Sequence, residues 1–371
     1  MTCPWRSVTI RLAAIAGCAI AFGLPGRAAG QTAHDPADVD PLAITSEMRD
    51  FLAEHAPRDM ARQVRLLELQ DAMFDPEQGL GIEYGSHGTR TAAQAFSDGR
   101  GNCLSFTLLF VALAREAGLN PYFVEVAEVT GWSQRGSVGF SHWHMFAEVE
   151  IDNGFVQVDF LPWLDRRYRS SRRIDEQRAR AHFFNNVGAE TLSDGDVKLA
   201  VAYFERALEF DSTFVPAKIN FAVAMGRQKR HEEAIDLLLE VLDDEPRNVV
   251  AAANLASRYL AQGRDSEARD WLARRQSFLD DNPFHHFKLG LRALETGDAQ
   301  QARQHFKRAI TRQRDEAIFF EQLAEAHLRL GAERKARSAL RRALDLTEDP
   351  GRREQIEARL RLHPLQPSGI S

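Results

Sequence analysis

The sequence predicts two structural parts, an N-terminal α+β domain and a C-terminal all-α solenoid. Three observations support this prediction. From residue 181 onward the chain repeats itself every 34 residues, as helical repeat proteins do. Between about Pro41 and Arg180, an apolar helix that carries a cysteine precedes three strand-like segments. A chain of 371 residues is also long enough for two domains.

Residues 1–30 have the order of a secretory signal peptide. Arg6 and Arg11 precede an apolar run from Leu12 to Leu24, and the small-residue stretch GRAAG follows. The run is shorter than the roughly 20 residues of a spanning helix, so no transmembrane span is expected. We expect cleavage near Gly30 and a periplasmic or secreted location. In the alternative interpretation, the stretch IAGC is a lipobox and Cys18 carries a lipid anchor.

The composition is that of an ordinary soluble globular protein. Hydrophobic residues make up 44% of the chain and charged residues 27%, which is ample material for a core. The formal net charge of -6 argues against a nucleic-acid partner, because such proteins need a basic surface.

The first domain, residues 41–180, is expected to begin with helices. Apolar residues at helical spacing, bounded by Pro57 and Pro76, predict two of them, in SEMRDFLAEHAP and RDMARQVRLLELQDAMF. A third helix is expected from Leu104 to Glu116, where Gly118 ends the 3.6-residue period. The expected strands are YFVEVAEV, HWHMFAEVEI and FVQVDF.

Only one cysteine remains after the expected cleavage. Cys3 and Cys18 leave with the signal peptide, and Cys103 stands at the predicted start of the apolar helix. An oxidising compartment normally pairs its cysteines, so an unpaired thiol points to chemistry. A thiol reacts as the thiolate, which a helix N-terminus and a nearby imidazolium both favour.

Two histidines and an acid can complete a catalytic arrangement with Cys103. His142 and His144 lie two residues apart, so on a strand both face the same side. Asp159, on the next strand, can orient an imidazole. No cofactor is needed for such a triad. His142 is a candidate for a supporting position, an alternative base or a structural residue, and Asn102 is a second supporting candidate.

The register of one hairpin decides whether His144 and Asp159 meet. If Asn153 and Gly154 formed a two-residue turn, Asp159 would face Glu148, four residues from His144. If IDNG is a four-residue loop, Asp159 lies diagonally from His144 with the same side-chain parity. The triad hypothesis therefore requires the longer loop.

Other interpretations of these residues stay open. Cys103 can be a small buried apolar residue. Cys103, His142, His144 and Asp159 are also ligand types that suit Zn²⁺, although no metal is expected. Aromatic residues of the same region are more often core than cleft-lining, and acids on strands are more often solvated than catalytic. These residues are Trp132, Trp163, Glu125, Glu128 and Glu148.

Three short blocks in this domain carry a family resemblance. GNC opens an apolar helix that ends ALAREAGL, HMFAEV stands where relatives have His-Ala-Trp-x-Glu, and VQVDF where they have Val-x-Val-Asp-Pro. Residues 80–162 thus resemble the transglutaminase-like superfamily, with its papain-like α+β fold. The resemblance implies that Cys103 is the nucleophile, His144 the general base and Asp159 its orienting acid. Phe146 and Phe160 depart from the family pattern without touching the triad.

The second domain consists of five in-phase blocks that start at residues 181, 215, 249, 283 and 317. Small residues recur at the eighth and twentieth positions, and large apolar ones at the seventh and twenty-fourth. Gly195, Gly263, Gly297 and Gly331 fall where the first helix of a block must stop, and Lys229 replaces this glycine in the second block. Residues 181–350 thus resemble tetratricopeptide repeats (TPRs), and residues 351–362 a polar capping helix.

The two resemblances, together with the expected signal peptide, imply an exported enzyme with a binding scaffold. Members of the superfamily include protein cross-linkers, peptidases, amidases and inactive copies. We expect cysteine-dependent acyl transfer on peptide or carboxamide bonds of a protein or peptide substrate, with hydrolysis favoured over cross-linking. The concave surface of the repeats is expected to bind a protein partner. The alternative is a catalytically inactive domain that supports an interaction scaffold.

Overall fold

The computed structural model describes residues 35–85, 88–126, 131–135, 138–142, 144–152, 154–160, 170–347 and 350–362, without the side chains of residues 131–142 and 350. The chain divides into a short unit, Met1–Val39, and a long one, Asp40–Ser371. In the short unit, the described residues contain the 3-10 turn η1 (Pro36–Asp38). The expected signal peptide, its cleavage site and Cys18 lie outside the described residues. None of the helices described is long and apolar enough to cross a membrane.

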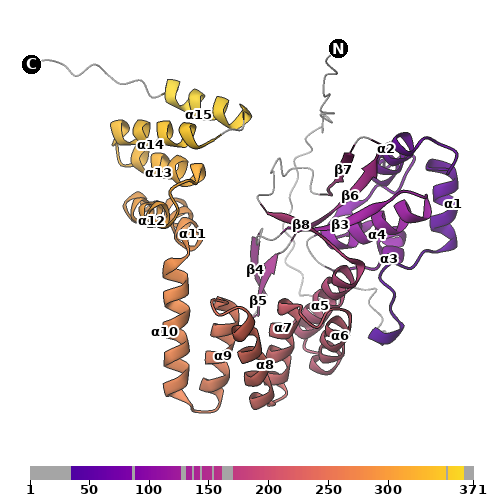
Figure 1. Ribbon diagram of the computed structural model, residues 1–371, viewed down its shortest axis with the longest axis horizontal. Coiled ribbons are helices and arrows are strands. Elements are labelled where there is room, and N and C mark those ends of the chain that lie inside the picture. Colours follow the sequence, from indigo (N-terminus) through magenta and orange to yellow (C-terminus); the bar gives the residue numbers. More distant parts are fainter. Residues whose placement is uncertain are drawn as a thin grey trace, which may run out of the picture. The chain divides into compact units, whose positions relative to one another are not determined.

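Four helices begin the long unit, and three of them are the predicted ones (Figure 1). Thr45 starts the first helix by accepting a hydrogen bond from the backbone of Met48, and Thr91 forms a capping box with Gln94. The helices are α1 (Ser46–His55), α2 (Arg62–Phe74), α3 (Ala92–Asp98) and α4 (Cys103–Glu116).

The central sheet has four strands in the order β7-β6-β3-β8. The three predicted strands correspond to β3, β6 and β7. However, β6 begins at Met145 and His142 lies on β5, so the prediction that His142 and His144 share a strand was wrong. The sequence patterns did not predict β8, because its sequence is polar. They did not predict β1 and β2, because each has only two residues. The strands are β1 (Glu83–Tyr84), β2 (Arg100–Gly101), β3 (Pro121–Val126), β4 (Gly131–Arg135), β5 (Val138–His142), β6 (Met145–Ile151), β7 (Gly154–Val158) and β8 (Ser171–Ile174).

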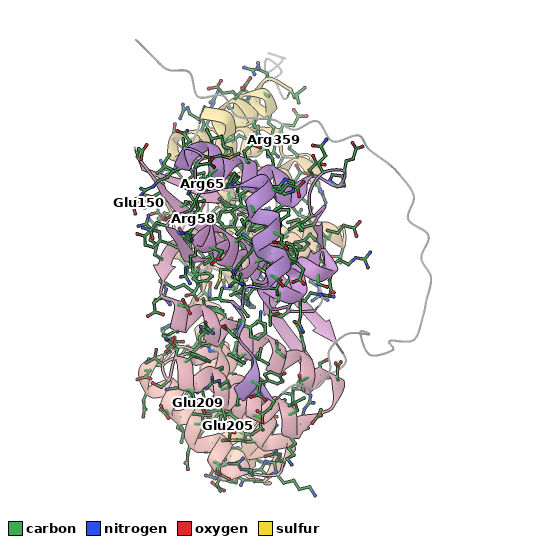
Figure 2. The ribbon with its side chains drawn as sticks, turned by 90° about the vertical axis from the view of Figure 1, so that its right-hand side faces the viewer. Arg58, Arg65, Glu150, Glu205, Glu209 and Arg359 are labelled. Atoms are coloured by element: carbon green, nitrogen blue, oxygen red, sulfur yellow. The ribbon has the colours of Figure 1, made fainter. Side chains whose placement is uncertain are left out.

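Helix α4 is the core element of the α+β part. Its residues from Leu104 to Ala114 are all buried, and it packs on β3 and β6. Two arginines bind the carbonyl groups at its C-terminal end: Arg58 donates to Glu116 O at 2.6 Å, and Arg65 donates to Ala117 O at 2.6 Å (Figure 2). Cations at a helix C-terminus stabilise the helix dipole, so these arginines fix α4 from the end opposite to Cys103.

The solenoid follows the predicted 34-residue period. The first helices of blocks two to five begin at the first residue of each block. Helix α5 begins five residues earlier than the first block. The helices are α5 (Glu176–Asp194), α6 (Val197–Phe210), α7 (Val215–Arg227), α8 (His231–Asp244), α9 (Val249–Ala261), α10 (Asp265–Asp281), α11 (Pro283–Glu295), α12 (Ala299–Arg312), α13 (Ala317–Arg329), α14 (Glu333–Leu346) and α15 (Pro350–Leu362).

The eighth and twenty-fourth positions of a block match each other in size. A Cβ atom on Gly188 would lie 2.7 Å from the Phe204 ring, and one on Gly290 would lie 2.4 Å from the Phe306 ring. The other three blocks pair alanine with leucine at these positions. The larger side chain thus fills the space that the glycine leaves, which explains why small residues recur in the repeat.

The third block departs from the regular packing. Helix α10 buries Ala268 alone, and Leu272, which was expected to fill the seam between two helices, is 42% exposed. One buried apolar cluster ends at Ala268, and another begins at Ala293. The prediction for Leu272 was therefore wrong. Arg275 stands at the twenty-seventh position of this block, where three blocks have alanine and the second has Val241. This departure predicts a locally looser third block, which agrees with the break in the core.

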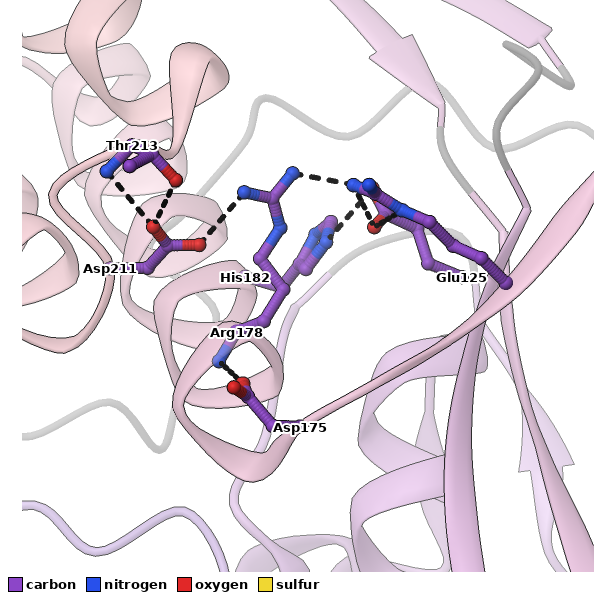
Figure 3. Close-up of polar contacts among 7 residues, drawn as sticks. Glu125, Asp175, Arg178, His182, Asp211 and Thr213 are labelled. Carbon is purple, nitrogen blue, oxygen red and sulfur yellow. Dashed lines mark hydrogen bonds and ion pairs between the residues drawn. The ribbon is translucent and has the colours of Figure 1, made fainter.

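Glu125 on β3 corrects a second prediction. We expected it on a solvated strand face, but it is only 3% exposed, because helix α5 covers this part of the strand. Arg172 Nη2 lies 3.1 Å from its carboxylate, His182 Nε2 3.4 Å and Arg178 Nη2 3.7 Å (Figure 3). Burial alone would raise the pKa of Glu125, but the hydrogen bond from His182 and the positive charges lower it to about 2.

Candidate active site

Cys103 is the first residue of α4 and is partly exposed. The helix begins there because Asn102 caps it: its Oδ1 accepts hydrogen bonds from the backbone N–H of Ser105 at 2.9 Å and from the Ser105 hydroxyl at 2.9 Å. The unsatisfied N–H groups of the first turn give this end a partial positive charge. A partial positive charge of this kind stabilises a nearby anion.

The other end of the Asn102 side chain is also bound. Its Nδ2 donates to Thr89 Oγ1 at 3.0 Å, and the Thr89 hydroxyl donates to Glu190 Oε1 on α5 at 2.8 Å. The backbone N–H of Thr89 donates to the same carboxylate oxygen at 3.0 Å. Asn102 therefore positions the start of α4 and links it to the first helix of the solenoid.

His144 and Asp159 lie in contact across the β6–β7 hairpin. His144 Nε2 lies 2.9 Å from Asp159 Oδ1 and 3.0 Å from Oδ2. Ala147 pairs with Val158, which is the register that the longer loop gives, and this part of the prediction is confirmed. The loop itself is shorter than expected, because pairing continues to Ile151 and Gly154. Only residues 152 and 153 separate the two strands.

The environment of His144 favours its charged form. The side chain is 1% exposed, and burial alone would lower its pKa. Hydrogen bonds to Asp159 and Cys103, with Coulombic attraction from both, raise the pKa of His144 to about 9. Because the carboxylate contacts Nε2, Nδ1 is the ring nitrogen that remains for the thiol. The ring therefore interacts with Cys103 as well as with Asp159.

Thr107 connects the Cys103 side of the site with the His144 side, and it was not predicted from the sequence. Its buried hydroxyl lies 2.8 Å from the carbonyl oxygen of Cys103 and 3.1 Å from that of Met145, next to His144. The backbone N–H of Val126 also donates to the His144 carbonyl, at 2.9 Å. The sequence did hold one signal for this role, because Thr107 is a hydroxyl residue inside the apolar run LSFTLLFVALA. A hydroxyl buried in such a helix needs a hydrogen-bond partner.

Aromatic rings pack beneath the acid. Phe160, the residue after Asp159, is 2% exposed, and its ring centroid lies 5.7 Å from Phe74, 5.8 Å from Phe106 and 6.0 Å from Phe110. This packing holds the end of β7 against α4. Phe160 therefore anchors the Asp159 backbone at a position where the family pattern has proline.

Tyr84 on β1 also borders the site. Burial, together with the negative charges of Cys103 and Asp159, raises the pKa of Tyr84 to about 12. The sequence held no signal for this tyrosine, because β1 has only two residues and no periodic pattern.

Some predicted residues cannot be placed in the site. The backbone of His142 lies on β5 opposite Gly131, but its side chain and that of Trp132 are outside the described residues, as are Trp163 and Glu128. Within the described part of the chain, no group of three or more His, Cys, Asp or Glu side chains is arranged to hold a metal ion.

Comparisons with known families agree with this architecture. Residues 74–160 match the model of the transglutaminase-like superfamily. Residues 227–283 and 287–352 match two tetratricopeptide-repeat models. A search of curated proteins gives no match.

Solved structures similar to the chain include three matches of low identity. The first is the Cut9–Hcn1 heterotetramer of the APC/C, with 22% identity, a TM-score of 0.27, and coverage of 50% of this chain but only 37% of that chain. The second is MamA from Desulfovibrio magneticus RS-1, with 14% identity, a TM-score of 0.26, and coverage of 45% and 94%. The third is YrrB, described as a TPR protein with an unusual peptide-binding site, with 18% identity, a TM-score of 0.25, and coverage of 48% and 92%.

Proposed function

Because residues 74–160 are a transglutaminase-like core domain that tetratricopeptide repeats follow, we propose that this protein is an exported enzyme for cysteine-dependent acyl transfer. Its substrate would be a peptide or carboxamide bond in a protein or peptide. The observation that best supports this proposal is the distance of 2.9 Å between His144 Nε2 and Asp159 Oδ1. The same imidazole ring also hydrogen-bonds Cys103.

The proposed reaction begins at the sulfur atom. The Cys103 thiolate attacks the carbonyl carbon, the new S–C bond forms, and the C=O electron pair moves to the oxygen. When the C=O bond re-forms, the C–N bond breaks, and the His144 imidazolium gives its proton to the departing nitrogen. The products of this half-reaction are a thioester on Cys103 and an amine or ammonia.

Water resolves the thioester in the second half of the proposed reaction. Neutral His144 takes a proton from the water, the hydroxide oxygen bonds to the carbonyl carbon, and the S–C bond breaks to return the thiolate. Hydrolysis needs only water, whereas transamidation also needs a binding site for an amine donor. We therefore favour hydrolysis, with the repeats binding the protein partner.

The test measures how fast Cys103 reacts with iodoacetamide in the chain from residue 31 to 371, which holds this single cysteine. We expect alkylation near neutral pH to be about 10-fold or more faster than that of a free cysteine, because the helix terminus and the imidazolium favour the thiolate. His144→Ala should remove this advantage, since it removes the paired charge.

A matched control and a contrary outcome make the test decisive. His285→Ala, on solenoid helix α11, should alkylate like the wild type. Alkylation of the wild type at the free-cysteine rate would contradict the enzyme proposal, and the inactive domain within a TPR scaffold would take its place.

A further inference from the structure

Strand β1 lies directly beside the segment that leads into the nucleophile. Tyr84 pairs with Gly101 in a parallel ladder, two residues before Cys103. The backbone N–H of Gly85 donates to Gly101 O at 2.8 Å, and that of Glu83 donates to Gly99 O at 2.7 Å. The position of Tyr84 relative to the start of α4 is therefore fixed by hydrogen bonds on both of its sides.

Gly101 shows which way Tyr84 projects. A Cβ atom on Gly101 would lie 2.7 Å from Ser105 Cβ and 3.4 Å from Phe106 Cε1, so this face of the ladder meets the first turn of α4. Directly paired residues of neighbouring strands project to the same face. Tyr84 thus points toward the helix turn that begins with Cys103.

The charges that act on Tyr84 agree with this direction. Burial first, and then Coulombic interactions with Cys103 and Asp159, raise the pKa of Tyr84 to about 12. At neutral pH the hydroxyl is therefore protonated and can donate a hydrogen bond. Tyr84 is also 37% exposed, so it borders solvent, from which a substrate would arrive.

We propose that the Tyr84 hydroxyl and the backbone N–H of Cys103 together form the oxyanion hole of this site. The inference rests on the acyl-transfer function proposed above. When the Cys103 sulfur bonds to the carbonyl carbon, the negative charge that develops on the oxygen accepts a hydrogen bond from the phenol. The phenol keeps its proton throughout, and the bond weakens when the C=O double bond re-forms.

Two reactions of Cys103 separate this role from other roles of Tyr84. Acylation by p-nitrophenyl acetate passes through a tetrahedral oxyanion and releases p-nitrophenolate, which needs no proton from His144. Alkylation by iodoacetamide displaces iodide and forms no oxyanion. Both reactions need the thiolate, but only acylation needs the proposed oxyanion hole.

We expect Tyr84→Phe to slow the burst of p-nitrophenolate on the order of 10- to 100-fold, which is the range for loss of one oxyanion donor. Its alkylation rate should equal that of the wild type. The matched control is Tyr122→Phe on β3, where the hydroxyl contacts Asn120 and Glu150 instead, and both rates should stay unchanged.

Each other outcome has its own meaning. If Tyr84→Phe is acylated as fast as the wild type, the oxyanion role is wrong while the proposed function stands. If both rates fall together, Tyr84 supports the thiolate or the fold, and the oxyanion role is again wrong; an unfolded variant would alkylate at the free-cysteine rate. If the wild type is not acylated, the proposed function itself fails.

Discussion

His144 sets the electrostatics of the site at the residue scale, because its ring is buried and interacts with both Asp159 and Cys103. Its pKa is raised to about 9, above the value near 6.5 of an exposed histidine. The charged ring therefore stabilises the folded protein fully below about pH 6.5, and this stabilisation is lost as the pH rises through 9.

We predict that NMR will find this titration near pH 9. The Cε1–H signal of His144, identified by its loss in His144→Ala, should shift near pH 9 in the wild type. In Asp159→Asn the titration should move toward acid pH, because the carboxylate that hydrogen-bonds Nε2 is gone. If His144 of the wild type titrates near pH 6.5, its pKa is not raised by its neighbours and the prediction is wrong.

The residues predicted from the sequence are those with a chemical pattern. Cys103, His144 and Asp159 stood out because their residue types and order match a known mechanism, and the parity argument placed the last two together. Thr107 and Tyr84 belong to no such pattern and depend on how helix and strands approach each other. Glu125 was assigned wrongly because strand alternation cannot reveal a helix from a later segment.

At the scale of single elements, the backbone of Lys229 is strained at the turn that ends helix α7. It has φ of 65°, the left-handed conformation that Gly195, Gly263, Gly297 and Gly331 adopt at the same place in their blocks. Its N–H donates to Gly226 O at 3.2 Å, and that of Arg230 donates to Met225 O at 3.0 Å, so the helix-ending motif forms despite the side chain. A residue with a Cβ atom pays a steric penalty there.

We predict that Lys229→Gly stabilises the protein by about 0.5–1 kcal/mol in urea unfolding, since it removes the penalty but loosens the unfolded chain. Lys229→Ala is the matched control: it removes the long side chain, keeps the Cβ atom, and should leave the free energy of unfolding nearly unchanged. Equal stabilisation by both variants would contradict the backbone explanation and point to the lysine charge.

The starts of the first helices in blocks two to five were predictable to the residue, because each block has the same pattern of small and large residues between its two helices. The side chain at the eighth position limits the size of the side chain at the twenty-fourth, and the reverse is also true. The 34-residue period therefore remains visible although the blocks are otherwise dissimilar in sequence. In the third block, by contrast, the seam residue Leu272 is exposed although it has the expected apolar type. Residue type alone does not show whether a neighbouring helix comes close enough to bury a side chain.

At the scale of the whole molecule, helix α5 belongs to the repeats by its sequence but bonds both sides of the candidate active site. Glu190 binds Thr89, which binds the Asn102 cap of the nucleophile helix. Arg178 and His182 surround Glu125 (Figure 3). The backbone N–H of Val126, the next residue along β3, donates to the His144 carbonyl oxygen. The first repeat is therefore a structural part of the site as well as the start of the solenoid.

We predict that Glu190→Ala will lower both stability and thiol reactivity. The buried N–H and hydroxyl of Thr89 would lose their acceptor, which costs about 1–3 kcal/mol. The cap of α4 would then be held less firmly, so iodoacetamide should alkylate Cys103 more slowly than in the wild type. Urea unfolding and the alkylation rate measure the two effects on the same sample.

Glu205→Ala is the matched control, since Glu205 lies exposed on α6 (Figure 2) and should change neither measurement. Lower stability with wild-type alkylation in Glu190→Ala would mean that α5 supports the fold but does not position the nucleophile. A loss of both, absent in the control, would instead mean that contacts made by the first repeat reach the thiol. Binding of a partner that shifts α5 would then change the reactivity of Cys103 through Glu190, Thr89 and Asn102, because the Asn102 amide donates to Thr89 and Thr89 donates to Glu190.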